Sequence, residues 1–495
     1  MKTLVFLTFT LLSATGASAQ KNSTRPNIIY ILADDMGIGD ARCYNPSGKI
    51  ATPNTDKMAA RGMRFTDAHS GSAVCTPTRY GILTGRYSWR SRLQSGVLNG
   101  YSPPLIDSAR LTVPQLLKNN GYSTGIIGKW HLGMTWAMNG KTPDFTQPLR
   151  HTPLSNGFDY YFGISASLDM PPYVFIENDQ LTEMPTDTVV AKQYPNTRPG
   201  PKGPGFVFEH ALQTMANKTQ AYIQDHKQHP FFLYLALPSP HTPLAAGAAF
   251  KGKSGICNYA DYVMETDWLL GQVMTYLEQE GLVDNTLLIF TSDNGYAPYA
   301  EYDKLKAAGH DPSAGFRGNK ADLYEGGHRI PFLVQWPGKV KPGTVNAATV
   351  CLTDLMATCA AIVGKPLPPD AGPDSFSLLP LLQGRNKQYK RTSTIHHSIS
   401  GHFAIRQGDW KLLLSPGSGG WSEPRDPAAR KQGLPERQLF NLRTDKAERH
   451  NLQASEPAVV ARLTALLQEL IDKGRSTPGP VQSNDVAVDM RKEKS

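Results

Sequence analysis

Short apolar segments recur along this chain at intervals that leave room for a helix, and each has the length of a β-strand. They span residues 27–33, 121–128, 231–237, 285–290 and 330–336. Strands that are apolar on both faces are typical of a parallel sheet that helices cover on both sides. The pattern therefore predicts an α/β fold with a mainly parallel central sheet.

Two further segments, 112–119 and 258–280, are predicted helices. In folds of this class the chemistry gathers beyond the carboxyl ends of the strands. Polar residues follow four of the predicted strands, in the order Asp34 and Asp35, Lys129 and His131, His241, Asp293 and Asn294. We therefore expect these side chains to meet at one edge of the sheet.

Residues 139–206 are rich in Pro, Gly, Asn and Thr. Long loops in a compact domain are usually functional or disordered, so this stretch is predicted to form loops that wall a substrate site. Beyond the Pro-rich stretch the chain breaks into strand-like pieces at 393–398, 403–414 and 439–442, followed by an amphipathic helix at 459–473. We expect a catalytic domain over 20–380 and a small α+β subdomain over 381–495, with a loose polar end at 476–495.

Residues 1–19 have the composition of a secretory signal peptide. Lys2 precedes the apolar stretch 4–12, and Ala17-Ser18-Ala19 forms a small-residue cleavage site. The apolar stretch is too short to span a bilayer, and no later segment is long and apolar enough. Gln20 takes the place of the Cys of a bacterial lipoprotein. The sequence therefore predicts an exported protein, periplasmic or secreted, without a membrane span.

The formal net charge of +9 fits two kinds of partner. A basic chain suits nucleic acid, but no stripe of Arg and Lys interleaved with aromatic residues and no nucleic-acid motif is present. A polyanionic, sulfated substrate fits the same charge equally well. We therefore expect no nucleic-acid partner, although net charge alone does not decide the question.

Four cysteines remain besides Cys75: Cys43, Cys257, Cys351 and Cys359. An exported compartment permits disulfides, so these residues could form two pairs. They could equally be small buried apolar side chains. The sequence leaves both alternatives open.

Asp34, Asp35, Asp293 and Asn294 together offer three carboxylates and one amide oxygen at the ends of predicted strands. Oxygen ligands of this kind suit a hard cation such as Ca²⁺ better than Zn²⁺. Histidine in place of Asn294 would favour a transition metal. The sequence therefore predicts a site for one Ca²⁺ ion.

Cys75 lies in the segment Val74-Cys75-Thr76-Pro77-Thr78-Arg79. Pro77 suits the first turn of a helix, where its missing N–H costs nothing. In such a helix Arg79 lies one turn after Cys75 and supplies the positive charge that activates a thiolate or its oxidised product. Cys75 and Arg79 are therefore candidate catalytic residues.

Four more side chains complete the candidate site. Lys129 and His131 are two residues apart, which places them on one side of an extended segment. His241 lies between two prolines, and Lys320 lies in the Gly-rich loop 318–322. Several cations around one anion-binding point are what a sulfate monoester requires.

The Cys-x-Pro-x-Arg pattern at Cys75 resembles the signature of type I sulfatases of the alkaline phosphatase superfamily, arylsulfatases and bacterial glycan sulfatases in particular. The resemblance covers most of the mature chain and includes the strand into Asp34-Asp35, Gly81, 83–86, 128–133, His241, 293–295, Lys320 and 403–412. It implies an alkaline phosphatase-like α/β sandwich with a mainly parallel sheet. It also implies a small C-terminal antiparallel sheet packed by a helix.

The resemblance further implies how the site is completed. A formylglycine-generating maturation enzyme would oxidise Cys75 to an aldehyde, hydrated to a gem-diol. The modified residue would share one Ca²⁺ ion with Asp34, Asp35, Asp293 and Asn294.

The resemblance also gives each remaining residue a role. One hydroxyl of the gem-diol would attack sulfur, while Ca²⁺ and Arg79 stabilise the oxyanion and Lys129 and Lys320 neutralise the sulfuryl oxygens. His241, with Lys320, would protonate the leaving oxygen. His131 would help to deprotonate the second hydroxyl, which then expels sulfate.

The predicted substrate is an O-sulfate group on a carbohydrate, because export, basic charge and a loop-rich rim favour a glycan or glycosaminoglycan over a small aryl sulfate. Residues 139–206 and 396–402 are candidate pocket walls, although His396 and His397 also fit a fold-supporting role. The alternatives are a phosphomonoesterase or phosphodiesterase on the same fold and an inert glycan-binding protein. Cys75 and Asn294 argue against the phosphoesterase, and the modification signature argues against the inert binder.

Overall fold

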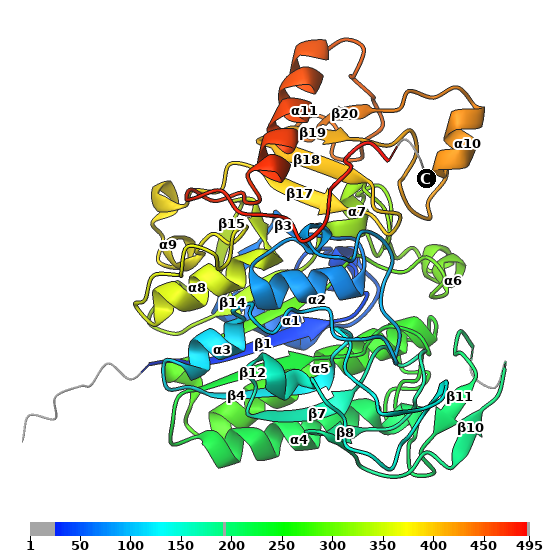
Figure 1. Ribbon diagram of the computed structural model, residues 1–495, viewed down its shortest axis with the longest axis vertical. Helices are drawn as coiled ribbons and strands as arrows, with labels where there is room; N and C mark the ends of the chain where they lie inside the picture. Colours follow the sequence, from blue (N-terminus) through cyan, green and yellow to red (C-terminus); the bar gives the residue numbers. More distant parts are fainter. Residues whose placement is uncertain (1–24, 192–194, 493–495) are drawn as a thin grey trace, which may run out of the picture.

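A ten-stranded sheet crosses the centre of the molecule (Figure 1). The computed structural model describes residues 25–191 and 195–492, so the predicted signal peptide lies outside the described residues. In spatial order the strands are β15 (Thr344–Asn346), β2 (Met63–Phe65), β14 (Phe332–Gln335), β13 (Thr286–Ser292), β1 (Asn27–Ala33), β12 (Phe231–Ala236), β4 (Ser123–Lys129), β7 (Tyr160–Ile164), β8 (Ile176–Glu177) and β9 (Gln180–Leu181).

The middle of this sheet is parallel and buried. β1 pairs in parallel with β12 on one side and β13 on the other, and every residue of the three strands is buried. β4 and β7 continue the parallel array beyond β12. β14, the strand predicted at 330–336, pairs antiparallel with β13. The sheet is therefore mixed but mainly parallel, which confirms the predicted fold class.

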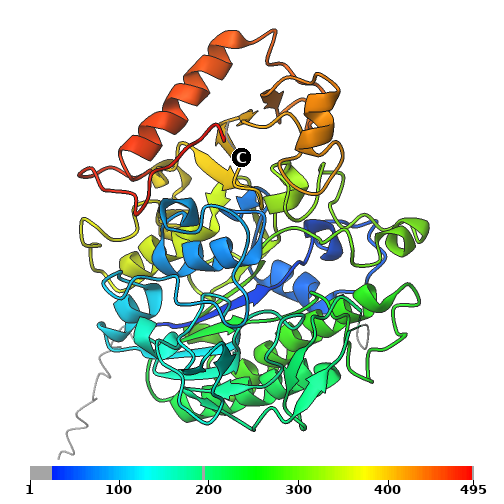
Figure 2. The same cartoon turned by 45° about the vertical axis from the view of Figure 1, so that its right-hand side comes forward.

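Two helical layers cover the sheet, and each encloses an apolar core (Figures 1 and 2). One layer holds α1 (Pro53–Arg61), α4 (Ala211–His226) and α5 (Asn258–Gln279), and the other holds α2 (Cys75–Thr84), α3 (Val113–Lys118) and α8 (Leu355–Ile362). α3 begins where the Thr112 hydroxyl accepts a hydrogen bond from Gln115 N (3.3 Å). Both predicted helices are confirmed, as α3 and α5.

Residues 139–206 hold more regular structure than the predicted loops. β7 lies within this stretch and adds five residues to the central sheet beside β4. Short antiparallel pairs form as well, between β5 (Met138–Asn139) and β6 (Thr142–Pro143) and between β10 (Asp187–Val189) and β11 (Gly200–Lys202). The prediction of loops throughout is wrong because β7 is stabilised by packing beside β4, which local composition does not reveal.

The C-terminal part forms its own four-stranded antiparallel sheet, which the resemblance implies. Its strands are β17 (Thr394–His397), β18 (Phe403–Gln407), β19 (Trp410–Leu413) and β20 (Gln438–Asn441). α11 (Pro457–Asp472) packs on this sheet, and its apolar stripe shares one core with Ile405 and Leu412. The piece predicted at 403–414 is a hairpin of two strands, β18 and β19.

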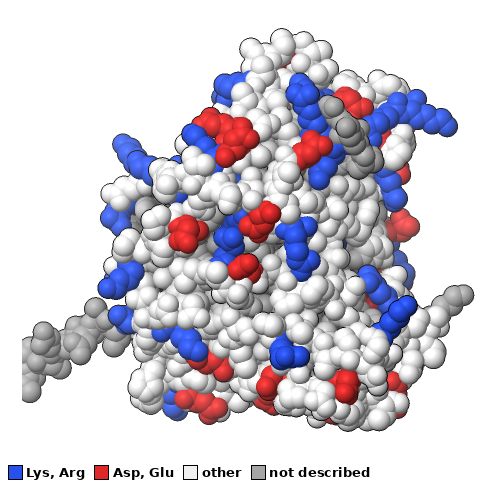
Figure 3. Space-filling model, viewed as in Figure 1, with Lys and Arg blue, Asp and Glu red and all other residues white. Residues whose placement is uncertain are grey.

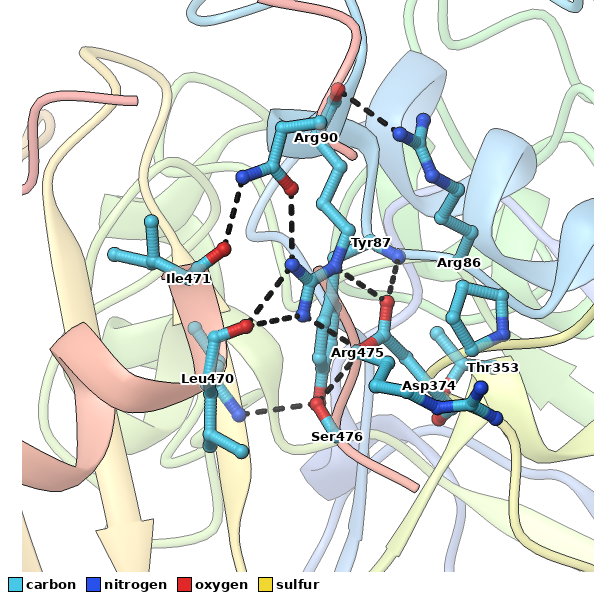
Figure 4. Close-up of polar contacts among 12 residues, drawn as sticks. Arg86, Tyr87, Arg90, Thr353, Asp374, Leu470, Ile471, Arg475 and Ser476 are labelled. Atoms are coloured by element: carbon cyan, nitrogen blue, oxygen red, sulfur yellow. Dashed lines mark hydrogen bonds and ion pairs between the residues drawn. The ribbon is translucent and has the colours of Figure 1, made fainter. Parts of the chain in front are cut away.

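The C-terminal stretch is bound to the rest of the molecule as far as residue 492, so the prediction of a loose end is wrong for the described residues. Arg86 and Arg90 are buried, and Arg86 Nη2 donates to Asp485 Oδ1 (3.0 Å) in this stretch. Figure 4 shows Arg90 between Asp374 and the carbonyl of Leu470, to which it also donates. Buried guanidinium donors require acceptors, and the polar tail supplies several of them.

All five cysteines lie in the described residues and all are free thiols, Cys43 half-buried and the others buried. The structure therefore agrees with the interpretation as small buried side chains and not with two disulfides. Among residues 25–191 and 195–492, no helix combines the length and the apolar character that crossing a membrane requires.

Candidate active site

The carboxyl ends of β1 and β13 bring the predicted acidic residues together. Asp34 and Asp35 follow β1, and Asp293 and Asn294 follow β13. The last residues of the two strands, Ala33 and Ser292, are paired in register. Asp35 N donates to Asp293 Oδ1 (3.2 Å), and all four side chains are at most 1% exposed. The predicted meeting of these side chains at one sheet edge is what the structure shows.

Cys75 opens α2 and faces the same edge of the sheet. Val74, just before the helix, is extended, and Pro77 lies in the first turn, as the sequence predicts. A ligand atom of Cys75 lies within 4.8 Å of ligand atoms of both Asp34 and Asp293. Burial raises the pKa of the Cys75 thiol, so the unmodified side chain is a poor nucleophile near neutral pH.

Three cations neutralise the three carboxylates. Arg79, one turn after Cys75, donates to Asp293 Oδ2 through Nη2 (2.9 Å) and Nε (3.2 Å). Lys129 Nζ lies 2.5 Å from Asp34 Oδ2, and Lys320 Nζ lies 2.6 Å from Asp35 Oδ1. We call the set the strand-end cluster: Asp34, Asp35, Asp293, Asn294, Arg79, Lys129 and Lys320.

The strand-end cluster contains ligand atoms that accept no hydrogen bond within the described part of the chain. Asp34 Oδ1 and Asn294 Oδ1 are buried and have no hydrogen-bond partner among the described residues. Burial would raise the pKa of Asp34, but the ion pair with Lys129 holds it well below its usual value. Burial and the neighbouring charge of Asp34 raise the pKa of Asp293. Unpaired buried oxygens beside crowded carboxylates fit a hard cation such as Ca²⁺.

His241 lies at the edge of the strand-end cluster. Its Nδ1–H donates to the carbonyl of Thr242 (2.7 Å), which fixes the orientation of the ring. Its Nε2 lies 3.4 Å from Asp35 Oδ2 and 3.4 Å from Tyr299 Oη. His241 therefore directs Nε2 toward the space beside Asp35 and Lys320.

His131 differs from its predicted geometry. Its backbone φ is 56°, so the segment from Lys129 is not extended there. Its Nε2–H donates to the carbonyl of Leu98 (2.8 Å), and its Nδ1 is buried without a partner among the described residues. Burial and the charge of Lys129 lower the pKa of His131 well below its usual value. The ring is therefore neutral, with a lone pair on Nδ1.

Three residues near His241 were missed by the sequence analysis. Asp169 Oδ1 lies 4.0 Å from His241 Nδ1, and Asp169 belongs to the stretch predicted to wall the site. Tyr299 follows Asn294 by five residues, and its ring centroid lies 5.7 Å from that of Trp421. No motif marks Tyr299 or Trp421, and only the structure brings them together.

A second buried group of charged residues lies beneath the C-terminal sheet. We call it the histidine cluster: Asp67, His69, Glu325, His328, Arg329, His396, Arg406, Lys411 and Glu448. Its polar groups lie within hydrogen-bond distance of one another: His328 Nε2 lies 3.0 Å from Lys411 Nζ and 3.1 Å from the Leu323 carbonyl oxygen, and His328 Nδ1 lies 3.0 Å from His69 Nδ1. His69 Nε2 lies 2.8 Å from Asp67 Oδ1. Burial lowers the pKa of His69, His328 and His396, so the rings are neutral.

The three histidines of this cluster are close enough to suggest a metal site, but their orientation argues against one. The rings of His328 and His396 stack with centroids 3.7 Å apart and planes 8° apart. Lone pairs in nearly parallel planes cannot point to one ion, so these rings do not form a tetrahedral site. His396 and His397 are buried at 1% and 2% exposure, in agreement with a fold-supporting role rather than a pocket wall.

Known proteins resemble this chain in both sequence and structure. A family model described as Sulfatase matches residues 26–365, and one described as N-sulphoglucosamine sulphohydrolase, C-terminal, matches residues 317–416. An N-acetylgalactosamine-6-O-sulfatase of Bacteroides thetaiotaomicron is 35% identical over 505 residues, which span 93% of this chain and 96% of that protein. Human arylsulfatase A is 33% identical over 90% of this chain and 87% of its own length.

A solved structure described under the metabolism of multiple glycosaminoglycans by Bacteroides thetaiotaomicron superposes with a TM-score of 0.79. The two chains are 34% identical, and the superposition covers 90% of this chain and 99% of the other. The similarity therefore extends over both the central sheet and the C-terminal sheet.

Proposed function

The chain belongs to the sulfatase family and is a sulfuric ester hydrolase, and on that premise we propose that it removes O-sulfate groups from a carbohydrate by a formylglycine mechanism. The observation that carries the proposal is the position of Cys75, which opens a helix next to Asp34 and Asp293 of the strand-end cluster. The unpaired oxygens of Asp34 and Asn294 support a single Ca²⁺ ion held by Asp34, Asp35, Asp293, Asn294 and the modified Cys75. Ca²⁺ held there would act as a Lewis acid toward the sulfate ester.

The environment of Cys75 supports its conversion to formylglycine. As a thiol the side chain is buried and its pKa is raised although Lys129 and Lys320 lie nearby. The neighbouring cations therefore do not activate the unmodified thiol as a nucleophile. Hydrated formylglycine supplies two hydroxyls on one carbon, one to attack sulfur and one to release the sulfate afterwards. A maturation enzyme is therefore a required partner in this proposal.

The cations of the site bind and orient the sulfate group. Lys129 and Lys320 each lie within hydrogen-bond distance of one carboxylate, and both are nearly inaccessible to solvent. Because these lysines are shielded from solvent, their charges stabilise the sulfuryl oxygens more than they would in water. Arg79 donates a hydrogen bond to Asp293 and adds positive charge one helical turn from Cys75.

Two histidines move the protons. His241 Nδ1–H is fixed by the Thr242 carbonyl, so a proton on Nε2 is aimed at the leaving oxygen of the substrate, which departs as an alcohol. His131 is neutral with an unpaired Nδ1, and it accepts a proton from the Cys75-derived group in the second half of the reaction.

A carbohydrate substrate is supported by the relatives named as an N-acetylgalactosamine-6-O-sulfatase and as part of glycosaminoglycan metabolism. The net charge of +9 suits an anionic glycan. On the face that Figure 3 shows, basic and acidic side chains are interspersed rather than gathered in a basic stripe. The N-terminal composition supports export to the periplasm or the medium, where the protein would encounter such glycans.

Sulfate release provides the test. Protein made with a maturation enzyme is incubated with N-acetylgalactosamine 6-sulfate, other sulfated monosaccharides, 4-methylumbelliferyl sulfate and the matching phosphates, before and after EGTA treatment. We expect sulfate release that falls on chelation and returns with Ca²⁺ but not with Zn²⁺. Phosphate release restored by Zn²⁺ would favour the phosphoesterase alternative, and sugar binding without turnover would favour the inert binder.

A further inference from the structure

Two aromatic rings lie beside the strand-end cluster, and the proposed reaction does not use them. Tyr299, on the loop after β13, is 41% exposed, and its ring centroid lies 5.7 Å from that of Trp421. Tyr299 Oη lies 3.4 Å from Lys320 Nζ and 3.4 Å from His241 Nε2. The rings therefore stand next to the two side chains that face the leaving oxygen.

Trp421 reaches this position from the C-terminal subdomain because its loop is pressed against the loop of Lys320. The backbone N–H groups of Trp421 and Ser422 donate to Asp322 Oδ1 (2.7 and 3.0 Å). A Cβ on Gly420 would lie 2.3 Å from the carbonyl oxygen of Ala321, so only glycine permits this approach. The contact fixes the aromatic ring relative to the site.

Asp169 lies on the opposite side of His241. Its side chain is 13% exposed, and its Oδ1 is buried without a hydrogen-bond partner among the described residues. Oδ1 lies 4.0 Å from His241 Nδ1, and Oδ2 lies 3.9 Å from Arg198 Nε, both longer than a hydrogen bond. A largely buried carboxylate oxygen is costly to leave without a hydrogen bond, so Asp169 is suited to accept one from a bound ligand.

We propose that Tyr299, Trp421 and Asp169 form a sugar-binding subsite for the ring that carries the sulfate. The inference rests on the proposed function, because it takes the sulfate to be bound by the strand-end cluster. Aromatic faces pack on the apolar face of a pyranose, and a carboxylate accepts hydrogen bonds from its hydroxyls. The ligand class is therefore a sulfated pyranose with a free hydroxyl near the sulfated position.

Comparing a sugar sulfate with an aryl sulfate tests the subsite. Trp421→Ala should lower kcat/KM for N-acetylgalactosamine 6-sulfate by about 10- to 100-fold, mainly through KM, because apolar contact with the sugar is lost. Asp169→Asn should lower it by a similar factor, because the hydroxyl donors lose a charged acceptor. In both variants the ratio of kcat/KM for the sugar sulfate to that for 4-methylumbelliferyl sulfate should fall.

Further variants test whether the aromatic ring of Tyr299 itself binds the sugar. Tyr299→Phe keeps the ring and should lose less activity on the sugar sulfate than Tyr299→Ala. Tyr302→Ala is the matched control, since Tyr302 is also exposed (38%) but packs against Tyr296, with ring centroids 6.1 Å apart. This control should behave as the wild type on both substrates, and thermal denaturation of every variant confirms that it is folded.

The outcomes distinguish this inference from the proposed function. Wild-type protein that hydrolyses a sulfated sugar, with unchanged sugar-to-aryl ratios in Trp421→Ala and Asp169→Asn, would overturn the subsite and leave the proposed function standing. Equal losses on both substrates would indicate a structural role and also overturn the subsite. Wild-type protein active on aryl sulfate but on no sulfated monosaccharide would overturn the carbohydrate substrate and the subsite together.

Discussion

The strand-end cluster and the histidine cluster have the same balance of charge but differ in how completely their carboxylate oxygens are paired with cations and donors. Each contains three carboxylates and three Lys or Arg side chains, nearly all buried. In the histidine cluster, Asp67 Oδ1 accepts from His69 and Arg406 (2.8 and 2.7 Å), and Oδ2 accepts from Thr349. In the strand-end cluster, Asp34 Oδ1 and Asn294 Oδ1 accept nothing from the described residues.

The difference shows that charge count and burial do not identify a reactive site. In the histidine cluster every carboxylate lies within ion-pair distance of a Lys or Arg side chain of the cluster, including Glu448, whose Oε1 accepts no hydrogen bond from the described residues but lies 2.9 Å from Lys411 Nζ. The cluster joins the central sheet to the C-terminal sheet, so it stabilises the fold. The strand-end cluster leaves ligand oxygens unused at the carboxyl ends of β1 and β13, where ligands bind in sheets of this class. Unpaired acceptors in the right place are therefore the better sign of function.

The same substitution made in each cluster should give opposite results. Asp293→Asn keeps an acceptor for Arg79 but removes one charged oxygen ligand, so we expect kcat/KM for a sulfate ester to fall by about 1,000-fold. The melting temperature should change little, because the lost carboxylate is crowded by Asp34 and its pKa is raised. Steady-state kinetics and thermal denaturation of the same preparation provide both numbers. Full activity in Asp293→Asn would contradict the assignment of the strand-end cluster as the reactive site.

Asp67→Asn is the matched change in the histidine cluster. It leaves Arg329 and Arg406 buried without their shared carboxylate, to which Arg406 Nη1 now donates at 2.7 Å. Breaking a buried ion pair in this way should lower the free energy of unfolding by about 3–5 kcal/mol. Urea denaturation measures the loss, and kcat of the protein that remains folded should stay within about threefold of wild type. A stable but inactive Asp67→Asn protein would contradict the structural role.

The buried histidines should make stability depend on pH. Burial lowers the pKa of His396 in the folded state, while an unfolded histidine has a pKa of about 6.5. Below pH 6.5 the unfolded chain therefore binds a proton that the native ring does not, and stability falls as the pH falls. Each such histidine contributes about 1.4 kcal/mol per pH unit. Denaturation of His396→Leu at pH 6 and pH 5 should show a slope smaller by this amount, and an unchanged slope would mean that the ring is already protonated in the native protein.

An exposed ion pair is expected to contribute least to the free energy of unfolding. Arg61 Nη1 lies 2.7 Å from Glu278 Oε1, and both side chains are more than 40% exposed. Solvent and salt screen such a pair, so Glu278→Gln should change the free energy of unfolding by less than about 1 kcal/mol. Urea denaturation at low and high salt measures this, and a loss as large as that of Asp67→Asn would show that burial is not what separates the clusters.

Most of the strand-end cluster could be predicted because it depends on local sequence and strand order. Asp34 and Asp293 each follow a recognisable strand directly, and parallel neighbours end at the same edge. The helix that begins at Cys75 is likewise encoded by the residues around Pro77. The conformation of His131 could not be predicted, because a positive φ is uncommon for a residue other than glycine and no local motif marks it here.

Contacts between distant segments account for what the sequence did not reveal. Trp421 meets Tyr299 because a loop of the C-terminal subdomain packs against residues near Lys320. His396, in β17, stacks on His328, which lies in the helix α7 (Glu325–His328). The C-terminal stretch contacts the rest of the molecule where Arg86 donates to Asp485. None of these pairings leaves a periodic or compositional trace, since each depends on how complete elements pack together.

The oxidation state of Cys75 decides whether the formylglycine mechanism operates in this protein. Peptide mass spectrometry is applied to the segment around Cys75 in protein that has been made with a maturation enzyme and shown to release sulfate. We expect a peptide that is lighter than the thiol form and reacts with hydrazides, as an aldehyde does, and activity that rises in proportion to the modified fraction. Full sulfatase activity in protein whose Cys75 is entirely an unmodified thiol would contradict it.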